Sequence, residues 1–97
     1  MRYRKLGNTG LDVSVIGLGA NNFGGRLDFD QTKIVLDQVL DEGINLIDTS
    51  NSYGNTLSEE YIGRALENRR ESVVLATKVS TRMGEGPNQA GNSRKHI

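Results

Sequence analysis

Residues 43–54 read Gly43-Ile44-Asn45-Leu46-Ile47-Asp48-Thr49-Ser50-Asn51-Ser52-Tyr53-Gly54, and this stretch decides the fold. An apolar run typical of a buried strand ends in the carboxylate Asp48, and Tyr53 follows in a polar loop. About one strand later, a second apolar run ends in Lys78. Two such runs predict strands of one sheet, with both charged residues near the same edge.

Outward from this stretch, strands and helices are expected to alternate after an N-terminal hairpin. The expected segments are hairpin strands 2–6 and 12–16, a buried strand 15–19, a loop 20–27, a helix 31–42, a strand 44–48, a helix 57–68, a buried strand 72–79, a loop 80–92 and a helix opening at 93–97. Such alternation predicts a parallel sheet with right-handed crossovers. A doubly wound sheet and a (β/α)₈ barrel both fit the pattern, which by itself does not choose between them.

The ends of the two helices carry capping signals. Asp30 is expected to cap the N-terminus of the first helix, and Gly43 stands where a left-handed residue would end it. Thr56 is followed three residues later by Glu59, which is the spacing of a capping box at the start of the second helix. Both helices are therefore bounded by local sequence signals.

Composition excludes several classes of function. The chain has 97 residues, which is one domain or less, with 12 basic and 12 acidic residues. This balance gives no argument for a nucleic acid or an anionic membrane as partner, and no apolar run approaches the roughly 20 residues that span a bilayer. There are no cysteines, so a disulfide or thiolate metal site is impossible, and the cytoplasm is the expected location. His96 is the one histidine, and no metal-ligand spacing surrounds it.

Asp48 and Lys78 are expected on the same face of the sheet, near the carboxyl ends of their strands, because side chains alternate along a strand. Barrel enzymes place their chemistry at this edge. A structural ion pair is the plain alternative, since such pairs also occur there. The presence of Tyr53 favours a catalytic role over a structural ion pair. A phenol with an ordinary pKa of about 10 is a poor acid at neutral pH, and a nearby ammonium lowers that pKa. The three residues together predict a tunable general acid, although Tyr53 alone would suit an aromatic residue packed on a helix.

The segment Gly17-Leu18-Gly19-Ala20-Asn21 is the second candidate for binding. A Gly-x-Gly at a strand end allows a ligand to approach the backbone closely. It is not a dinucleotide fingerprint, because Asn22 occupies the place of the third glycine and no helix begins at once. An ordinary strand-to-loop turn therefore remains the alternative.

Four motifs occur in a definite order and spacing. They are the opening 2–14, Gly17-Leu18-Gly19, the segment 43–63 with Asp48, Tyr53, Gly54, Glu59 and Gly63, and Thr77-Lys78. In this order they resemble the aldo-keto reductases, NAD(P)H-dependent enzymes built on a TIM barrel. The resemblance runs along the whole chain and is highly specific.

This resemblance implies a role for each residue of the predicted acid. Tyr53 would donate the proton, and Lys78 would lower its pKa. Asp48 would pair with Lys78 and also contact the nicotinamide ribose. Hydride would pass from the cofactor to the carbonyl carbon of a small aldehyde or ketone while Tyr53 protonates the oxygen.

The resemblance also implies a cofactor, which is NADPH, with NADH possible. Gly19, Ala20 and Asn21 would lie along it together with Asp48, and the loop after Lys78 would form part of the substrate rim. No metal is implied.

The implied fold class is α/β: the N-terminal part of a (β/α)₈ barrel, with three barrel strands and two helices after a hairpin. Residues 1–14 would be the hairpin cap, and residues 15–97 the first βα units of a single domain. The family's catalytic histidine stands at the end of the next barrel strand, which these 97 residues do not include, and His96 does not take its place. The 97-residue chain alone is therefore expected to be inactive.

Two other functions stay open. Potassium-channel β subunits share this fold and much of the motif set, so a nicotinamide-binding regulatory subunit is one alternative. A non-catalytic structural fragment is the other. The sequence does not identify the substrate or the oligomeric state.

Overall fold

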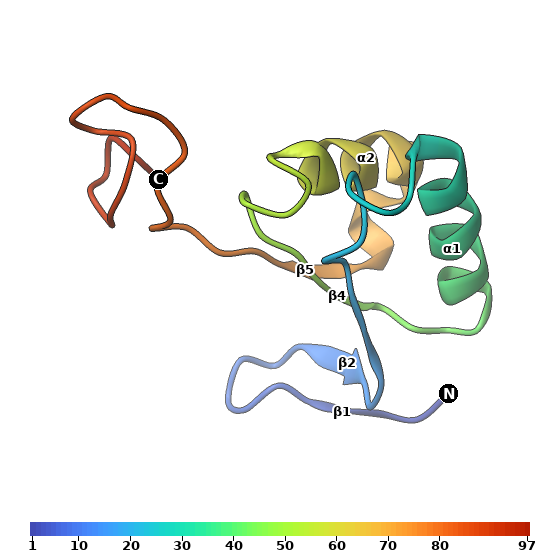
Figure 1. The fold of residues 1–97 in the computed structure, drawn as a ribbon. Coiled ribbons are helices and arrows are strands. Elements are labelled where there is room, and N and C mark those ends of the chain that lie inside the picture. The colour runs from blue at the N-terminus through green and yellow to red at the C-terminus, as the bar shows by residue number, and fades with distance from the viewer.

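A computed structural model describes residues 1–97 as a hairpin joined to a small α/β unit (Figure 1). The elements in chain order are β1 (Tyr3–Lys5), β2 (Asp12–Ser14), β3 (Gly17–Gly19), α1 (Phe29–Asp41), β4 (Leu46–Asp48), α2 (Leu57–Leu66), the 3₁₀ helix η1 (Glu67–Ser72) and β5 (Val74–Ala76). Strands β1 and β2 pair antiparallel, while β3, β4 and β5 form a parallel sheet in that order. The predicted hairpin, three parallel strands and two helices are confirmed.

The register of the parallel sheet divides its side chains between two faces. Opposite residues of neighbouring strands share a face, and successive residues alternate. One row packs against the helices and consists of Leu18, Ile47 and Leu75. The other face carries the rows Gly17, Leu46 and Val74, and Gly19, Asp48 and Ala76. Figure 1 shows α1 and α2 together on one side of the strands, so the face with Asp48 is uncovered.

A single core lies between the helices and the sheet. Its members come from both helices, β4 and the segments around β3 and β5; they are Ala20, Phe23, Leu36, Ile47, Ile62, Ala65, Leu66 and Val73. The burial of this apolar surface is the main term that holds the helices on the sheet.

A network of ion pairs at the surface joins α1 to η1 and to the end of α2. Asp37 on α1 accepts a hydrogen bond from Lys33 at 2.7 Å and another from Arg69 of η1 at 2.7 Å. Arg69 also donates to the carbonyl of Ala65 on α2 at 2.7 Å. The hydrogen bonds from Lys33 and Arg69 lower the pKa of Asp37 below its ordinary value.

The hairpin is attached at the amino end of β4. The side-chain amide of Asn45 makes two hydrogen bonds to the backbone of β2. Its Oδ1 accepts from the Ser14 N–H at 2.8 Å, and its Nδ2 donates to the Asp12 carbonyl at 3.0 Å. The hydroxyl of Tyr3 donates to the Gly43 carbonyl at 2.6 Å. The hairpin therefore lies at the end of the sheet opposite to Asp48.

Helix α1 begins earlier than expected, because Asp28 and not Asp30 is its N-cap. The Asp28 carboxylate accepts from the Gln31 N–H at 2.9 Å, and the Gln31 side chain accepts from the Asp28 N–H at 3.1 Å. This reciprocal pair satisfies two backbone donors, which Asp30 alone would not do. Asp30 lies in the first turn, where the helix dipole favours a negative charge.

The end of α1 is as the sequence predicts. Gly43 has a φ of +83°, and its N–H donates to the Leu40 carbonyl at 2.9 Å. The N–H of Ile44 donates to the Val39 carbonyl at 3.1 Å. These two bonds form a Schellman motif, whose left-handed residue glycine adopts without steric cost.

The capping box predicted for α2 is not formed. Thr56 is the N-cap, but its φ of +77° is left-handed and its side chain makes no capping bond. The first helical N–H groups are satisfied by the loop backbone instead: Leu57 donates to the Gly54 carbonyl at 3.2 Å, and Ser58 to the Tyr53 carbonyl at 3.2 Å. Glu59 is exposed and has no capping role.

The second helix and the strands are shorter than expected. Helix α2 ends at Leu66, before the expected residue 68, and η1 begins at the next residue, Glu67, whose φ is +49°. The prediction that the strand at 15–19 is buried is wrong, since Val15 is 47% and Ile16 is 59% exposed. Strands β3 and β5 are the edges of the sheet, and the face opposite the helices is uncovered. None of the helices has the length and apolar character needed to cross a lipid bilayer.

Two substitutions on α1 test this placement of the core. Leu36 is 0% exposed in the core, whereas Ile34 on the same helix is 69% exposed. We expect Leu36→Ala to lower the unfolding free energy of the complete protein by about 2–5 kcal/mol and Ile34→Ala to change it by no more than about 0.5 kcal/mol. Urea unfolding of both variants measures the difference. Equal losses would mean that α1 does not pack as described.

Candidate active site

Three predicted residues converge at the carboxyl end of the parallel sheet. Asp48 is the last residue of β4, Lys78 follows the end of β5, and Tyr53 lies in the turn after β4. Backbone pairing continues past the strand ends, where the Thr49 N–H donates to the Ala76 carbonyl at 2.8 Å. Lys78 is two residues beyond the register partner of Asp48 and shares its face, so the long side chain reaches back to the carboxylate.

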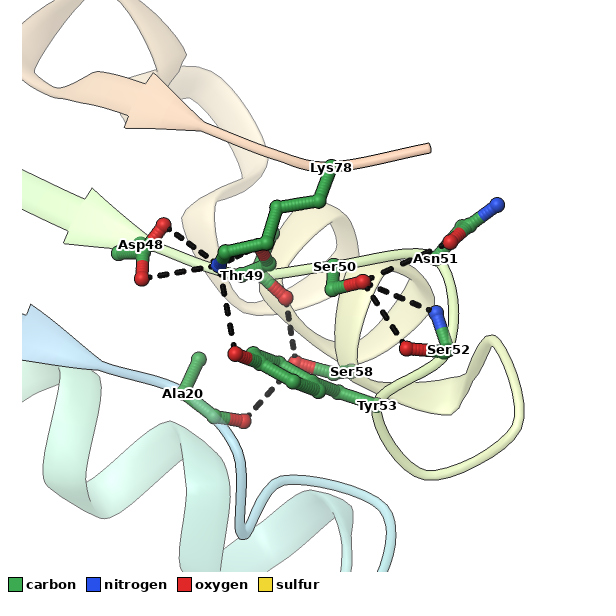
Figure 2. A network of polar contacts seen from close by, with 9 residues as sticks. All are labelled: Ala20, Asp48, Thr49, Ser50, Asn51, Ser52, Tyr53, Ser58 and Lys78. Carbon is green, nitrogen blue, oxygen red and sulfur yellow. Dashed lines mark hydrogen bonds and ion pairs between the residues drawn. The ribbon is translucent and has the colours of Figure 1, made fainter. Parts of the chain in front are cut away.

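The Lys78 ammonium is the centre of the site (Figure 2). It lies 2.8 Å from Asp48 Oδ1 and 2.9 Å from Asp48 Oδ2. It also donates to the Thr49 carbonyl at 2.9 Å and to the Tyr53 hydroxyl at 3.3 Å. The predicted proximity of the three residues is confirmed, while their roles in a reaction stay a prediction.

The electrostatics keep the ammonium charged. The hydrogen bond with Asp48 is the largest influence and raises the pKa of Lys78 above its ordinary value of 10.5; desolvation works against this, and the contact with Tyr53 adds to it. The side chains of Lys78 and Asp48 are 48% and 52% exposed. Water screens an ion pair at such exposure, so it contributes little to stability. What the pair provides is a fixed positive charge beside a phenol.

Tight turns position Tyr53. Its N–H donates to the Ser50 carbonyl at 3.2 Å, and its own carbonyl accepts from Ser58 of α2. The next residue, Gly54, has a φ of +58°, and a Cβ there would lie 2.5 Å from the Phe23 carbonyl oxygen. Only glycine fits, because the loop after β4 lies directly against the loop after β3.

Two buried hydroxyls beneath the site were missed by the sequence analysis. Thr49 and Ser58 are both 0% exposed, and their side-chain oxygens lie 2.7 Å apart. The Ser58 hydroxyl donates to the Ala20 carbonyl at 3.1 Å. A signal was present: Ser58, Ile62 and Ala65 share one face by helical spacing, which places a hydroxyl on the apolar face of α2.

The Gly-x-Gly segment lies beside the acid site. Gly19 pairs with Asp48 in the sheet register, and a Cβ on Gly19 would meet no atom within 4 Å. Gly19 and Asn21 are exposed, whereas Ala20 is fully buried in the core. Gly19 therefore presents surface on the face of Asp48. Asn21 is exposed in the turn that follows, and Ala20 is not accessible.

Two hollows are present, of which only one adjoins the site. A hollow of about 330 Å³ is lined by Asn51, Glu59, Thr77, Lys78, Val79, His96 and Ile97. The larger, about 420 Å³, lies between the hairpin and the end of α1 and contains none of the predicted site residues. The larger hollow is therefore not the one beside the predicted acid, and we assign the site by its charged groups and not by the volume of the hollow.

Comparison with known proteins agrees with this geometry. The sequence model described as "Aldo/keto reductase family" matches residues 15–97. The Arabidopsis thaliana protein named "Probable voltage-gated potassium channel subunit beta" is 41% identical over 101 residues, covering 100% of this chain and 30% of that protein. "Uncharacterized oxidoreductase YqkF" of Bacillus subtilis is 40% identical over 86 residues, covering 89% of this chain and 28% of that protein.

A solved structure is also similar. The holo form of an aldo-keto reductase from Bacillus halodurans matches with a TM-score of 0.81 and 37% identity, over 94% of this chain and 30% of that chain. The chain thus spans about 30% of the length of the relatives that it matches.

The raised pKa of Lys78 has a measurable consequence. Because the folded state binds this proton more tightly than the unfolded state, the stabilising effect is complete below the ordinary pKa near 10.5 and is lost as the pH rises through the raised value. We expect Asp48→Asn to bring the pKa of Lys78 down, because its largest raising influence is removed. Titration of the Lys78 side chain by NMR in the complete protein measures this. An unchanged midpoint would show that Asp48 does not pair with Lys78 in solution.

Proposed function

The chain belongs to the aldo/keto reductase family, and we propose that the complete protein is an NAD(P)H-dependent oxidoreductase that reduces small aldehydes or ketones to alcohols. The observation that carries this proposal is the Lys78 ammonium, which binds the Asp48 carboxylate and the Tyr53 hydroxyl at the open carboxyl end of the sheet. We place the protein in the cytoplasm on its cysteine-free composition.

Tyr53 is the proton donor in the proposed reaction. As the carbonyl oxygen of the substrate gains negative charge, the phenol gives up its proton to it. The phenolate left behind is stabilised by the ammonium, whose nitrogen lies 3.3 Å from the phenol oxygen. Asp48 contributes by holding that ammonium with both carboxylate oxygens.

The residues beside the acid fit a nicotinamide cofactor. The open space at Gly19, on the face that carries Asp48, leaves room for a flat ring against the sheet. Gly19, Asn21 and Asp48 would hold the cofactor, which when bound supplies a hydride to the carbonyl carbon. NADPH is the proposed form, with NADH as the alternative, and Ala20 contributes only its place in the core.

The proposed architecture is the N-terminal part of a (β/α)₈ barrel. Strands β3, β4 and β5 follow one another in order and in parallel, joined by helices on one side, as in successive βα units. Both edges, β3 and β5, have room for further strands. Residues 1–14 would cap one end of the barrel, and residues 15–97 would supply its first units within a single domain.

A regulatory nicotinamide-binding subunit is the second candidate. Its support is the 41% identity, over the whole chain, to the plant protein named as a potassium channel β subunit. Asp48, Tyr53 and Lys78 do not separate the two functions, because a bound nicotinamide suits both. Turnover separates them: a reductase oxidises many equivalents of NADPH with a carbonyl substrate, whereas a subunit that only binds the nucleotide does not.

Replacing the proposed acid tests the mechanism. In the complete protein we expect Tyr53→Phe to lower kcat for carbonyl reduction by about 10²–10⁴-fold, because it removes the proton donor, and to leave NADPH binding largely intact. Steady-state kinetics and fluorescence titration of NADPH measure the two effects. Tyr61→Phe is the matched control, since Tyr61 packs edge-on against Phe29 on the helices and should leave kcat unchanged. Near-normal turnover by Tyr53→Phe would assign the acid to another group.

The 97 residues expressed alone provide a separate test. A TIM barrel typically takes about 250 residues, and here the sheet edges are unpaired and Val15 and Ile16 are exposed. We expect the isolated chain to self-associate or fold incompletely and not to oxidise NADPH with a generic aldehyde. Sedimentation, circular dichroism and NADPH oxidation, with the complete protein alongside, check this. A monodisperse, cooperatively folding monomer with reductase activity would contradict it.

A further inference from the structure

Ser58 connects the segments that follow β3 and β4 (Figure 2). It is fully buried in the first turn of α2 and makes three contacts. Its N–H donates to the Tyr53 carbonyl at 3.2 Å, and its hydroxyl lies 2.7 Å from the Thr49 hydroxyl and 3.1 Å from the Ala20 carbonyl. One residue therefore touches the backbone of Tyr53, the residue after Asp48 and the residue after Gly19.

The direction of the hydroxyl chain follows from its chemistry. A carbonyl oxygen can only accept, so the single hydroxyl proton of Ser58 is used on the Ala20 carbonyl. The Ser58 oxygen must then accept from its other neighbour, and the Thr49 hydroxyl is the donor. The order is Thr49 to Ser58 to Ala20, and neither hydroxyl is left without a partner.

Thr49 links these two hydroxyls to the Lys78 ammonium of the site. Its backbone carbonyl accepts from the Lys78 ammonium at 2.9 Å, and its N–H donates to Ala76 at 2.8 Å. The side chain that anchors Thr49 to Ser58 thus belongs to the residue whose carbonyl orients Lys78. A shift of this side chain would move that carbonyl and the ammonium with it.

We propose that Thr49 and Ser58 are positioning residues: their hydroxyl relay fixes the Lys78 ammonium and the Tyr53 hydroxyl relative to the segment after β3. The inference rests on the proposed reductase function and adds two residues that touch neither substrate nor cofactor. Hydroxyls in an otherwise apolar core are directional, because each bond holds only in a narrow range of geometry. An isosteric apolar pair could fill the same space with little loss of stability, but without that orientation.

Five variants of the complete protein test the proposal. Thr49→Val and Ser58→Ala each remove one hydroxyl, the double variant removes both, and Thr49→Ser keeps the donor. Thr32→Val is the matched control, because Thr32 is also 0% exposed but its hydroxyl has no hydrogen-bond partner. For each variant, kcat, the KM for the carbonyl substrate and the melting temperature are measured.

The two single variants should lower kcat by about 10–100-fold, as expected for a small misplacement of reacting groups. The KM for the carbonyl substrate should stay near that of the unsubstituted protein, because neither hydroxyl touches the substrate. Thr49→Ser and Thr32→Val should retain the kcat of the unsubstituted protein. The double variant should recover much of the melting temperature lost in Ser58→Ala, since no buried hydroxyl is then left unpaired, but its kcat should stay low.

Recovery of kcat together with stability in the double variant would overturn the proposal, since the relay would then be structural only. So would a normal kcat in all five variants. If the unsubstituted protein does not reduce carbonyls, the proposed function fails. The positioning role is then tested by crystal structures instead of by kinetics. Crystal structures of the unsubstituted protein and of the double variant are then compared. The distance from Lys78 Nζ to Tyr53 Oη, which is 3.3 Å here, should exceed hydrogen-bond range in the double variant only. An unchanged distance would overturn the positioning role.

Discussion

The parallel pairing of β4 with both β3 and β5 is the constraint on which the rest of the structure depends. Its register sets Gly19, Asp48 and Ala76 side by side at the carboxyl ends of three strands. Because side chains alternate, the same register turns Ile47 into the core beneath the helices and Asp48 onto the open face. A slip by one residue would bury the carboxylate among apolar side chains and expose Ile47, which makes the register strongly specified.

Charged and neutral polar groups are separated in depth around the site. The Lys78–Asp48 pair is half exposed, so water lowers the cost of holding two charges there. Beneath it, Thr49 and Ser58 are neutral and fully buried, and each hydroxyl has its partner. Neutral hydroxyls suit this depth, because a buried charge without excellent pairing would cost far more than a satisfied hydroxyl.

Backbone strain gathers in the loop that carries Tyr53. Gly54, Asn55 and Thr56 have φ values of +58°, +52° and +77° in succession. Glycine and asparagine adopt this region with little cost, but for threonine it is unfavourable by roughly 1–3 kcal/mol. The surrounding contacts hold the strained turn: helical N–H groups bond to its carbonyls, and Gly54 lies against the Phe23 carbonyl. A strained turn thus lies beside the site, and single residues with positive φ also occur outside it, at Glu67 and Ser80.

The sequence by itself determined the order of the elements, the parallel sheet, the left-handed end of α1 at Gly43, and the meeting of Asp48, Tyr53 and Lys78. The order of the elements and the end of α1 depend on local periodicity and on glycine, which short stretches of sequence express. The meeting of the three residues follows once the two strands are neighbours, because strand alternation then places Asp48 and Lys78 on one face. Only the tertiary structure decided that Ala20 is buried and that Thr49 and Ser58 form a relay. The cap of α1 is instead local, because Asp28 and Gln31 stand at the spacing of a capping box. The burial of Ala20 and the relay both depend on contacts between segments that are far apart in the sequence. The hydroxyl of Ser58 pairs with residues 9 and 38 positions away in the sequence, and no local pattern encodes such a contact.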